Sequence, residues 1–106
     1  MGASEALLRT GFKIMEFDWL NCPFDLKATP PGEVAEAFED PFSIRLLPEL
    51  DDDGETRYFI IGKTVENRYL FSVFWTNGKV YRVIACRDCT DDERSFYERK
   101  NAEWLA

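Results

Sequence analysis

The sequence predicts a single α+β domain that spans residues 1–106. Three observations support this fold class. Apolar and polar residues alternate in several short runs, which indicates strands. A proline-led amphipathic segment and a capping box indicate helices. The connections between the later strands are short, so these strands pair as an antiparallel meander. We therefore expect an N-terminal strand, one or two helices, a four-stranded antiparallel meander and a C-terminal helix.

The N-terminal elements are expected as follows. Residues Phe12–Phe17 mix apolar and charged positions and predict the first strand. The stretch Asp18–Pro31 contains three prolines and is expected to be irregular, with room for one short helix. Thr29 is the expected N-cap of the next helix, because proline follows it. The apolar residues at helical spacing behind it are Val34, Ala37 and Phe38. Pro41 ends this helix, since the residue before a proline disfavours helical geometry.

The second half of the chain predicts strands joined by turns. The expected strands are Phe42–Leu47, Arg57–Gly62, Tyr69–Thr76 and Lys79–Cys86. The sequence Asp51-Asp52-Asp53-Gly54 predicts an acidic turn. Asn77-Gly78 between two apolar runs is a strong hairpin signal, because both central residues of the favoured turn have positive φ. Thr90 and Glu93 form a capping box that opens the C-terminal helix.

Composition excludes several functions. The chain has no histidine, which excludes a Ser-His-Asp triad, a Cys-His dyad and imidazole metal ligands. The net charge of −7 argues against nonspecific nucleic-acid binding by the whole surface. No run approaches the ~18 apolar residues of a membrane span, and the N-terminus lacks the features of a signal peptide. With three cysteines, we expect a cytoplasmic protein with reduced thiols.

Three motifs have both a functional and a structural interpretation. Cys86-Arg87-Asp88-Cys89 is a C-x-x-C where a strand meets a helix N-terminus, which lowers a thiol pKa and leaves open a redox pair or half a zinc site. The acidic turn fails as a calcium loop, because Ile60 stands where a bidentate glutamate is needed. We interpret the acids of 91–93 as helix-capping groups rather than an acid–base pair. No metal and no cofactor are predicted.

Basic residues are concentrated in the second half. Residues 1–56 hold 13 acidic and 4 basic residues, whereas residues 57–106 hold 7 acidic and 9 basic ones. Arginine presents a fixed fork of donors that fits phosphate oxygens, so Arg82 and Arg87 are candidate contacts of an RNA backbone. Alternatively, they form surface ion pairs with Asp88 or Glu93. Strand alternation places Tyr69, Phe71, Val73 and Trp75 on one face, where an exposed Trp75 could stack on a base.

Several motifs follow one another in a fixed order along the chain. They are Asp40-Pro41, then Arg57 to Lys63, then Arg68-Tyr69-Leu70, then Tyr81 to Arg87, and finally Glu93-Arg94 with Tyr97. This order resembles the BrnT family, the small ribonuclease toxins of type II toxin–antitoxin pairs, over about residues 12–98. The family usually carries a histidine-containing helix after its first strand. Here the corresponding residues 18–27 contain a proline and no histidine.

The resemblance implies a RelE-like fold and a metal-independent endoribonuclease that inhibits translation. It also implies neutralisation by a BrnA-like antitoxin in a hetero-oligomer. Carried over by position, the catalytic residues are Arg82, Arg87, Arg94 and Tyr97. The RNA-binding residues are Lys63, Arg57, Arg68 and Trp75. In this assignment Arg82 and Arg87 stabilise phosphate charge. Lys63 positions the RNA backbone, and Tyr97 transfers a proton or stacks. The alternative is a diverged, non-catalytic BrnT-like module that binds a protein partner through the same surface.

Overall fold

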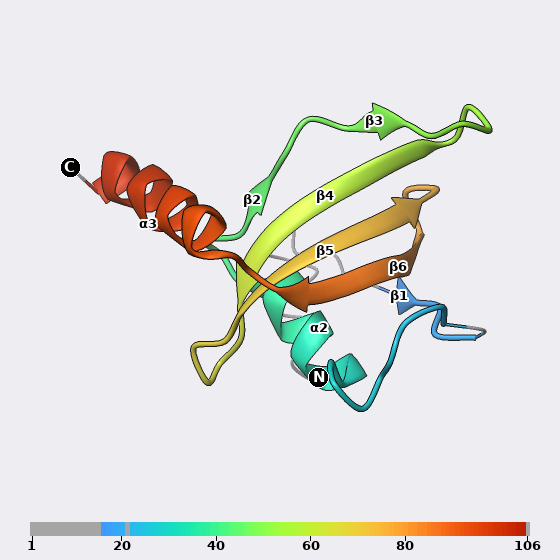
Figure 1. Ribbon diagram of the computed structural model, residues 1–106, viewed down its shortest axis with the longest axis horizontal. Helices are drawn as coiled ribbons and strands as arrows, with labels where there is room; N and C mark the ends of the chain where they lie inside the picture. Colours follow the sequence, from blue (N-terminus) through green and yellow to red (C-terminus); the bar gives the residue numbers. More distant parts are fainter. Residues whose placement is uncertain (1–15, 21, 106) are drawn as a thin grey trace, which may run out of the picture.

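The computed structural model describes residues 16–20 and 22–105, and within them the chain forms six strands and two helices (Figure 1). The helices are α2 (Pro31–Glu39) and α3 (Asp91–Leu105). The strands are β1 (Glu16–Phe17), β2 (Ile44–Arg45), β3 (Glu49–Leu50), β4 (Thr56–Lys63), β5 (Tyr69–Thr76) and β6 (Val80–Asp88). The α+β fold class is confirmed. Neither helix is long and apolar enough to cross a membrane.

The strands form one mixed sheet in the order β1-β6-β5-β4-β2, with β3 also pairing with β4. Strands β4, β5 and β6 are the antiparallel meander that the short connections predict. Among the described residues there is one strand more than the five expected, namely β3. The expected first strand is present as β1, which pairs in parallel with β6, and the additional β3 pairs with β4. Residues 12–15 of the expected first strand lie outside the described part of the chain.

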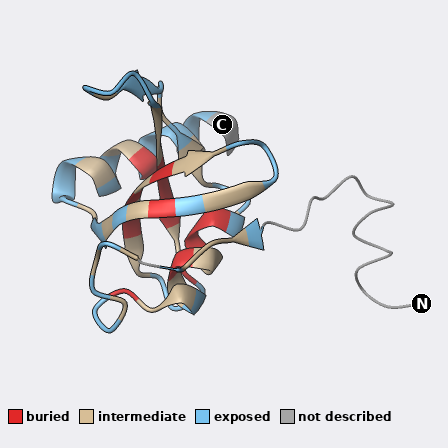
Figure 2. Cartoon of the chain, turned by 90° about the vertical axis from the view of Figure 1, so that its right-hand side faces the viewer, coloured by how far each residue is buried: buried red, intermediate tan, exposed pale blue. Residues whose placement is uncertain are grey.

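Helix α2 packs on one face of the sheet and supplies the centre of the core. Its side chains Val34, Ala37 and Phe38 are buried, as their spacing predicts. Val34 and Phe38 form one cluster with the inward-facing Ile60, Phe74 and Val83 of the three central strands. Figure 2 shows the buried residues concentrated on this helix and on the middle of the sheet. The other face of the sheet therefore stays free of α2.

Two local predictions are corrected. Pro30, not Thr29, is the N-cap of α2, and no side chain caps the helix. The Thr29 hydroxyl instead donates to the carbonyl of Asp25 at 3.2 Å, so it is used by the preceding turn. Among the residues described before α2, the second short helix is also absent.

The Asn77-Gly78 hairpin is present, but its turn differs from the expected one. Only Gly78 has a positive φ, of 93°, and Asn77 does not. The side-chain oxygen of Asn77 accepts the backbone N–H groups of Lys79 and Val80, each at 2.9 Å. This side chain organises a longer loop, so the second positive φ is not needed.

The C-terminal helix begins as predicted. Thr90 and Glu93 exchange hydrogen bonds, with the Glu93 N–H donating to the Thr90 hydroxyl at 3.2 Å and the Thr90 N–H donating to the Glu93 carboxylate at 2.8 Å. This capping box fixes the point at which α3 leaves β6. The helix then crosses one end of the sheet on the face opposite α2 (Figure 1).

Candidate nucleic-acid interface

We call the face of β4–β6 that is opposite α2 the outer face. Paired residues of neighbouring strands point to the same side of a sheet, so the registers define its members. They are Arg57, Phe59, Ile61 and Lys63 on β4, Tyr69, Phe71, Val73 and Trp75 on β5, and Arg82, Ala85 and Arg87 on β6. Arg94 of α3 lies over Tyr69 and is counted with the outer face. The alternation predicted for β5 is confirmed, because Leu70, Ser72 and Phe74 are buried on the opposite side.

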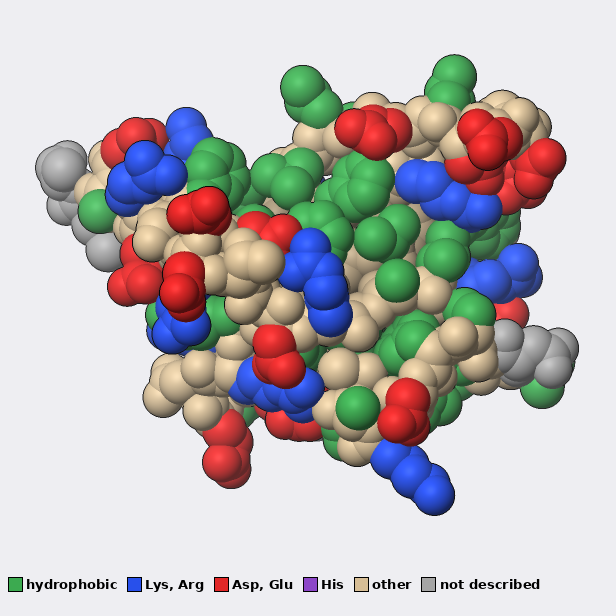
Figure 3. All heavy atoms as spheres, viewed as in Figure 1, with side chains coloured by type: hydrophobic (Ala, Val, Ile, Leu, Met, Phe, Trp, Pro, Cys, Tyr) green, Lys and Arg blue, Asp and Glu red, His purple; other side chains and the backbone are tan. Residues whose placement is uncertain are grey.

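The outer face combines an apolar floor with basic side chains. Figure 3 shows hydrophobic side chains gathered over the middle of the sheet, between α3 and the β2–β3 segment, with Lys and Arg side chains among and around them. Phe59 and Phe71 lie side by side on this floor, with 6.0 Å between ring centroids. A surface of this kind offers both stacking partners for bases and donors for phosphates.

A β-bulge brings Arg82 and Arg87 to the same face. The two arginines are five positions apart, and strict strand alternation places residues at an odd separation on opposite faces. The β5–β6 register shifts between Val73 and Phe74, which leaves Ile84 on β6 as an extra residue. Both arginines therefore point to the outer face. Sequence alternation alone does not reveal this alignment.

The basic residues of the outer face form two groups. At the α3 end, Lys63 and Arg94 both lie over the ring of Tyr69, at 5.6 and 5.5 Å from its centroid. Arg87 lies over the ring of Phe71 at 4.5 Å. Cations held over aromatic faces in this way are attracted by the ring quadrupole. Aromatic rings thus position three of the predicted site residues.

The second group lies near the β5–β6 hairpin. Arg82 lies over the indole of Trp75, at 5.3 Å from the ring centroid. These two side chains and Arg57 line a cavity of about 250 Å³, together with Glu55 and Ile84. The cavity and the α3 group are at opposite ends of the aromatic row on β5. Tyr69 and Trp75 are six positions apart, which corresponds to about 20 Å along a strand.

Each arginine of the outer face is paired with a carboxylate. The pairs are Arg57–Asp51 at 2.6 Å, Arg82–Asp18 at 3.5 Å, Arg87–Glu93 at 2.7 Å and Arg94–Asp91 at 3.2 Å. The alternative of surface ion pairs is therefore realised for Arg87 with Glu93, whereas Arg82 pairs with Asp18. The Arg87 guanidinium holds the pKa of Glu93 below its usual value through hydrogen bonds to both carboxylate oxygens. A phosphate that binds here has to compete with these carboxylates.

Tyr97 is placed in the interior rather than on the surface. Its side chain is only 4% exposed, and its hydroxyl donates to the carboxylate of Asp40 at 2.6 Å. The same carboxylate oxygen accepts the N–H of Lys63 at 2.9 Å, so it ties α3 to β4. Burial, followed by the hydrogen bond to Asp40, raises the pKa of Tyr97. The phenol thus stays protonated and serves as an anchor for α3.

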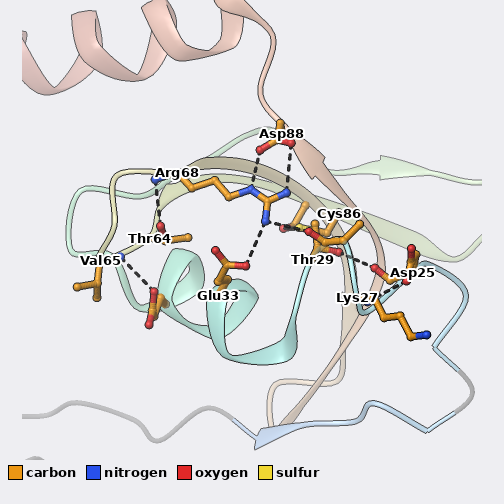
Figure 4. Close-up of polar contacts among 12 residues, drawn as sticks. Asp25, Lys27, Thr29, Glu33, Thr64, Val65, Arg68, Cys86 and Asp88 are labelled. Atoms are coloured by element: carbon orange, nitrogen blue, oxygen red, sulfur yellow. Dashed lines mark hydrogen bonds and ion pairs between the residues drawn. The ribbon is translucent and has the colours of Figure 1, made fainter.

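Arg68 lies on the α2 side of the sheet, away from the other predicted RNA contacts (Figure 4). Its guanidinium donates two hydrogen bonds to Asp88, at 2.7 and 3.2 Å. It also donates to Glu33 on α2 at 3.1 Å and to the carbonyl of Ala28 at 2.9 Å. These contacts join the ends of β5 and β6 to α2 and its preceding loop. This geometry favours a structural role for Arg68.

The C-x-x-C motif has an environment opposite to that of a reactive thiol pair. Burial raises the pKa of Cys86, and burial with the nearby Glu93 carboxylate raises the pKa of Cys89 to about 11. The Cys86 sulfur accepts the hydroxyl of Ser72 at 3.3 Å and packs against the core. The expected lowering of the thiol pKa is wrong, because desolvation is the largest influence on both thiols and raises the pKa. No cluster of three metal-binding side chains occurs among the described residues.

The structure adds three residues that the sequence reasoning did not assign to the site. Tyr69 is the platform for two cations, Asp40 anchors α3, and Glu55 lines the cavity beside Arg57. The alternation of β5 already places Tyr69 on the same face as Trp75, and Asp40 belongs to a motif of the family resemblance. The sequence gives no signal for Glu55, because it lies next to an acidic turn that has its own structural explanation.

On the outer face arginines surround an aromatic row, a combination of side chains that suits a polyanion with unstacked bases. Comparison with known proteins identifies the family. Residues 29–93 match the family described as the ribonuclease toxin, BrnT, of type II toxin–antitoxin systems. The match covers more than half of the chain, so the protein belongs to the BrnT family. Membership implies an RNA target and an antitoxin partner. No curated protein matches the chain.

Proposed function

We propose that this chain is an endoribonuclease that binds RNA across the outer face and cleaves it without a metal ion. The observation that carries the proposal is the alignment of Arg82 and Arg87 by the bulge at Ile84, over an aromatic floor. The family match supports the same reaction class. We further propose that the fold is RelE-like, that cleavage inhibits translation in the cytoplasm, and that a BrnA-like antitoxin neutralises the toxin.

The proposed chemistry uses the ribose 2′-hydroxyl as the nucleophile. Its oxygen gives up its proton to water and attacks the adjacent phosphorus, and the bond to the 5′-oxygen breaks. The departing 5′-oxygen takes up a proton from water, so that a 2′,3′-cyclic phosphate and a 5′-hydroxyl result. Charge builds up on the phosphate oxygens in the transition state, and fixed guanidinium groups stabilise that charge. In this scheme Arg82, Arg87 and Arg94 contact phosphate oxygens, and Lys63 positions the backbone. Arginine supplies this stabilisation without a histidine.

The roles of the remaining predicted residues follow from their contacts. Trp75 and Arg57 contact the RNA near the hairpin end of the face. Tyr97 acts as a positioning residue, because its buried hydroxyl holds α3 through Asp40. It thereby fixes Arg94, which is carried by the same helix. Arg68 supports the fold from the α2 side, as its contacts with Asp88 and Glu33 favour.

The decisive experiment is induction of the protein in bacteria, with growth and bulk RNA integrity as readouts. Wild type is expected to arrest growth and to fragment RNA. Arg82→Ala is expected to abolish both effects while remaining folded and expressed. Arg99→Ala is the matched control, because the hydrogen bond that this exposed arginine forms among the described residues goes to the backbone of its own helix. Full toxicity of folded Arg82→Ala would refute the site assignment.

A second candidate function is a non-catalytic module that binds a protein through the same face. The specific observation in its favour is that all four outer-face arginines are paired with carboxylates. Ion pairs neutralise the face and lower its attraction for RNA. Titration with excess RNA, followed by NMR, separates the two functions. An unchanged spectrum, combined with normal growth on induction, would favour the binding module.

A further inference from the structure

The cavity at the hairpin end of the outer face has the composition of a base-binding site. Its apolar walls are the Trp75 indole, with the Arg82 guanidinium lying over it, and the side chain of Ile84. Unpaired bases in RNA complexes are held against aromatic rings and against the planes of arginine guanidinium groups. The bulge creates this wall, since Ile84 is the residue that β6 inserts there.

The size of the cavity limits what it can hold. Its volume is about 250 Å³. Pockets for drug-sized ligands have roughly 300–1,000 Å³. The cavity therefore suits one planar ring system rather than a whole nucleotide. The phosphates on either side of that base would remain outside, near the arginines of the face.

The polar groups of the cavity are of two opposite kinds. Glu55 supplies a carboxylate that is 59% exposed and lies 3.4 Å from the Arg57 guanidinium. Arg57 has a stronger partner in Asp51, at 2.6 Å, which fixes its orientation. The Glu55 oxygens thus retain capacity to accept further hydrogen bonds. A bound base would meet a carboxylate acceptor and a fixed set of guanidinium donors together.

Only one of the four RNA bases presents two adjacent donors to a carboxylate. Guanine has N1–H and the N2 amino group side by side on its Watson–Crick edge, whereas adenine and cytosine offer one amino group and uracil one ring N–H. Guanine also carries the acceptors O6 and N7, which are the preferred partners of arginine. The combination of Glu55 with Arg57 therefore matches guanine better than any other base.

We propose that this cavity binds guanine and that the protein prefers RNA in which a guanine lies next to the cleaved bond. In this site Glu55 accepts the two donors of the Watson–Crick edge, Arg57 donates to the acceptors of the base, and Trp75 with Arg82 stacks on the ring. The proposal rests on the proposed ribonuclease function, because it names the base that this same face selects.

The test measures binding of single nucleotides to the free protein. The indole N–H signal of Trp75, assigned by its loss in Trp75→Phe, is followed while the 3′-monophosphates of guanosine, adenosine, cytidine and uridine are added. Guanosine 3′-monophosphate is expected to bind about five- to tenfold more tightly than the others. This corresponds to the low end of the discrimination by a bidentate base contact, as suits a partly exposed site.

Glu55→Gln is the diagnostic variant, because the amide keeps the shape but offers only one acceptor. Its affinity for guanosine 3′-monophosphate is expected to fall five- to tenfold, with the other three affinities changed less than twofold. Glu66→Gln makes the same chemical change on an exposed turn outside the cavity and is expected to behave as wild type. Sequencing of RNA fragments from induced cells tests the same preference at the cleavage sites.

The outcomes separate this proposal from the proposed function. Equal affinities for the four nucleotides, or a guanine preference that survives in Glu55→Gln, would overturn the guanine site. If wild type still cleaves RNA in that case, the ribonuclease function stands. If folded wild type binds none of the four nucleotides and leaves RNA intact, both proposals are overturned. A guanine preference that Glu55→Gln removes supports the guanine site, and RNA cleavage by wild type beside it supports the ribonuclease function.

Discussion

The hydroxyl of Tyr97 makes a buried hydrogen bond to a carboxylate that also holds the backbone of β4. Removing it in Tyr97→Phe leaves Asp40 with only the N–H groups of Lys63 and Phe42 as donors among the described residues. A hydrogen bond to a charged group contributes about 1.5–3 kcal/mol. We expect Tyr97→Phe to lower the free energy of unfolding by about that amount, measured by urea denaturation.

The same substitution tests the role of Tyr97. If the phenol is a positioning residue, the folded variant should retain RNA cleavage within about tenfold of wild type, whereas loss of proton transfer costs about 10²–10⁴ in rate.

The raised pKa of Tyr97 also predicts that the free energy of unfolding depends on alkaline pH. The stabilisation contributed by the Tyr97 hydroxyl is present below the unfolded pKa of about 10 and is lost as the pH rises above it. Tyr97→Phe should lack this alkaline loss of stability. Tyr58→Phe is the control, since the Tyr58 hydroxyl has no hydrogen bond among the described residues.

The pair of Arg87 and Glu93 gives a prediction at acidic pH. Glu93→Gln retains the capping box, because glutamine also fits its last position, so the variant removes mainly the charge. The pair is partly exposed, and we expect a loss of at most ~1 kcal/mol in the free energy of unfolding at pH 7. The lowered pKa of Glu93 means that its contribution is present above the unfolded pKa and is lost as the pH falls through the folded pKa.

The measurement is urea denaturation of wild type and Glu93→Gln between pH 7 and pH 3. The difference between the two proteins should shrink as the pH falls below about 4.5, the ordinary value for this carboxyl. A difference that stays constant over this range would show that the charge of Glu93 contributes nothing, and that the variant acts through the cap instead. Glu98→Gln, on the exposed side of α3, supplies the matched control.

Helix α2 packs closely on β4 at Gly62. A Cβ atom added at Gly62 would lie 2.7 Å from the carbonyl carbon of Ala37 and closer still to its oxygen. These are backbone atoms of α2 and cannot rotate away. Gly62→Ala should therefore push the helix off the sheet and lower the free energy of unfolding by about 3 kcal/mol or more, at the upper end for overpacked cores.

Thermal denaturation of two variants, Gly62→Ala and Gly32→Ala, checks this prediction. Gly32→Ala is the control, because nothing lies within 4 Å of its added Cβ and the residue sits in the first turn of α2. Alanine is favoured over glycine in helices by roughly 0.5–1 kcal/mol, so this variant should match or exceed wild-type stability. A Gly62→Ala variant as stable as Gly32→Ala would contradict the close approach of α2 to β4.

The elements also show what sequence patterns can and cannot predict. The bounds of β5, the apolar stripe of α2 and the capping box of α3 follow from local patterns and are confirmed. The strand β3 has only two residues and depends on pairing with β4, which no local pattern encodes. The bulge at Ile84 is likewise a property of two strands together. Alternation alone separates Arg82 from Arg87, so the candidate site emerges only once the strands are paired.

Charge is the property of the whole molecule that bears most on RNA binding. The net charge is −7, and each arginine of the outer face forms an ion pair with a carboxylate. A phosphate that binds an arginine must therefore displace a carboxylate, which weakens binding relative to a bare basic patch. The same ion pairs hold the guanidinium groups in fixed positions before RNA arrives. We expect modest affinity combined with a defined geometry.

The salt dependence of RNA binding tests this view of the whole surface. For single strands, the slope of log K against log salt concentration is about −0.7 for each neutralised phosphate. If Lys63 and the four arginines of the outer face each contact one phosphate, the slope should be about −3.5, and it should be no steeper. A 2′-O-methyl RNA is the probe, because it lacks the attacking hydroxyl and is not cleaved.

Each substitution of a phosphate contact should make this slope shallower by about 0.7. Arg87→Ala is expected to do so, and Arg99→Ala, on the part of α3 outside the outer face, is expected to leave the slope unchanged. Binding that is strong but insensitive to salt would contradict a phosphate-binding face and would favour recognition by stacking alone. A slope that changes equally in both variants would mean that RNA senses the overall charge of the protein rather than the aligned arginines of the sheet.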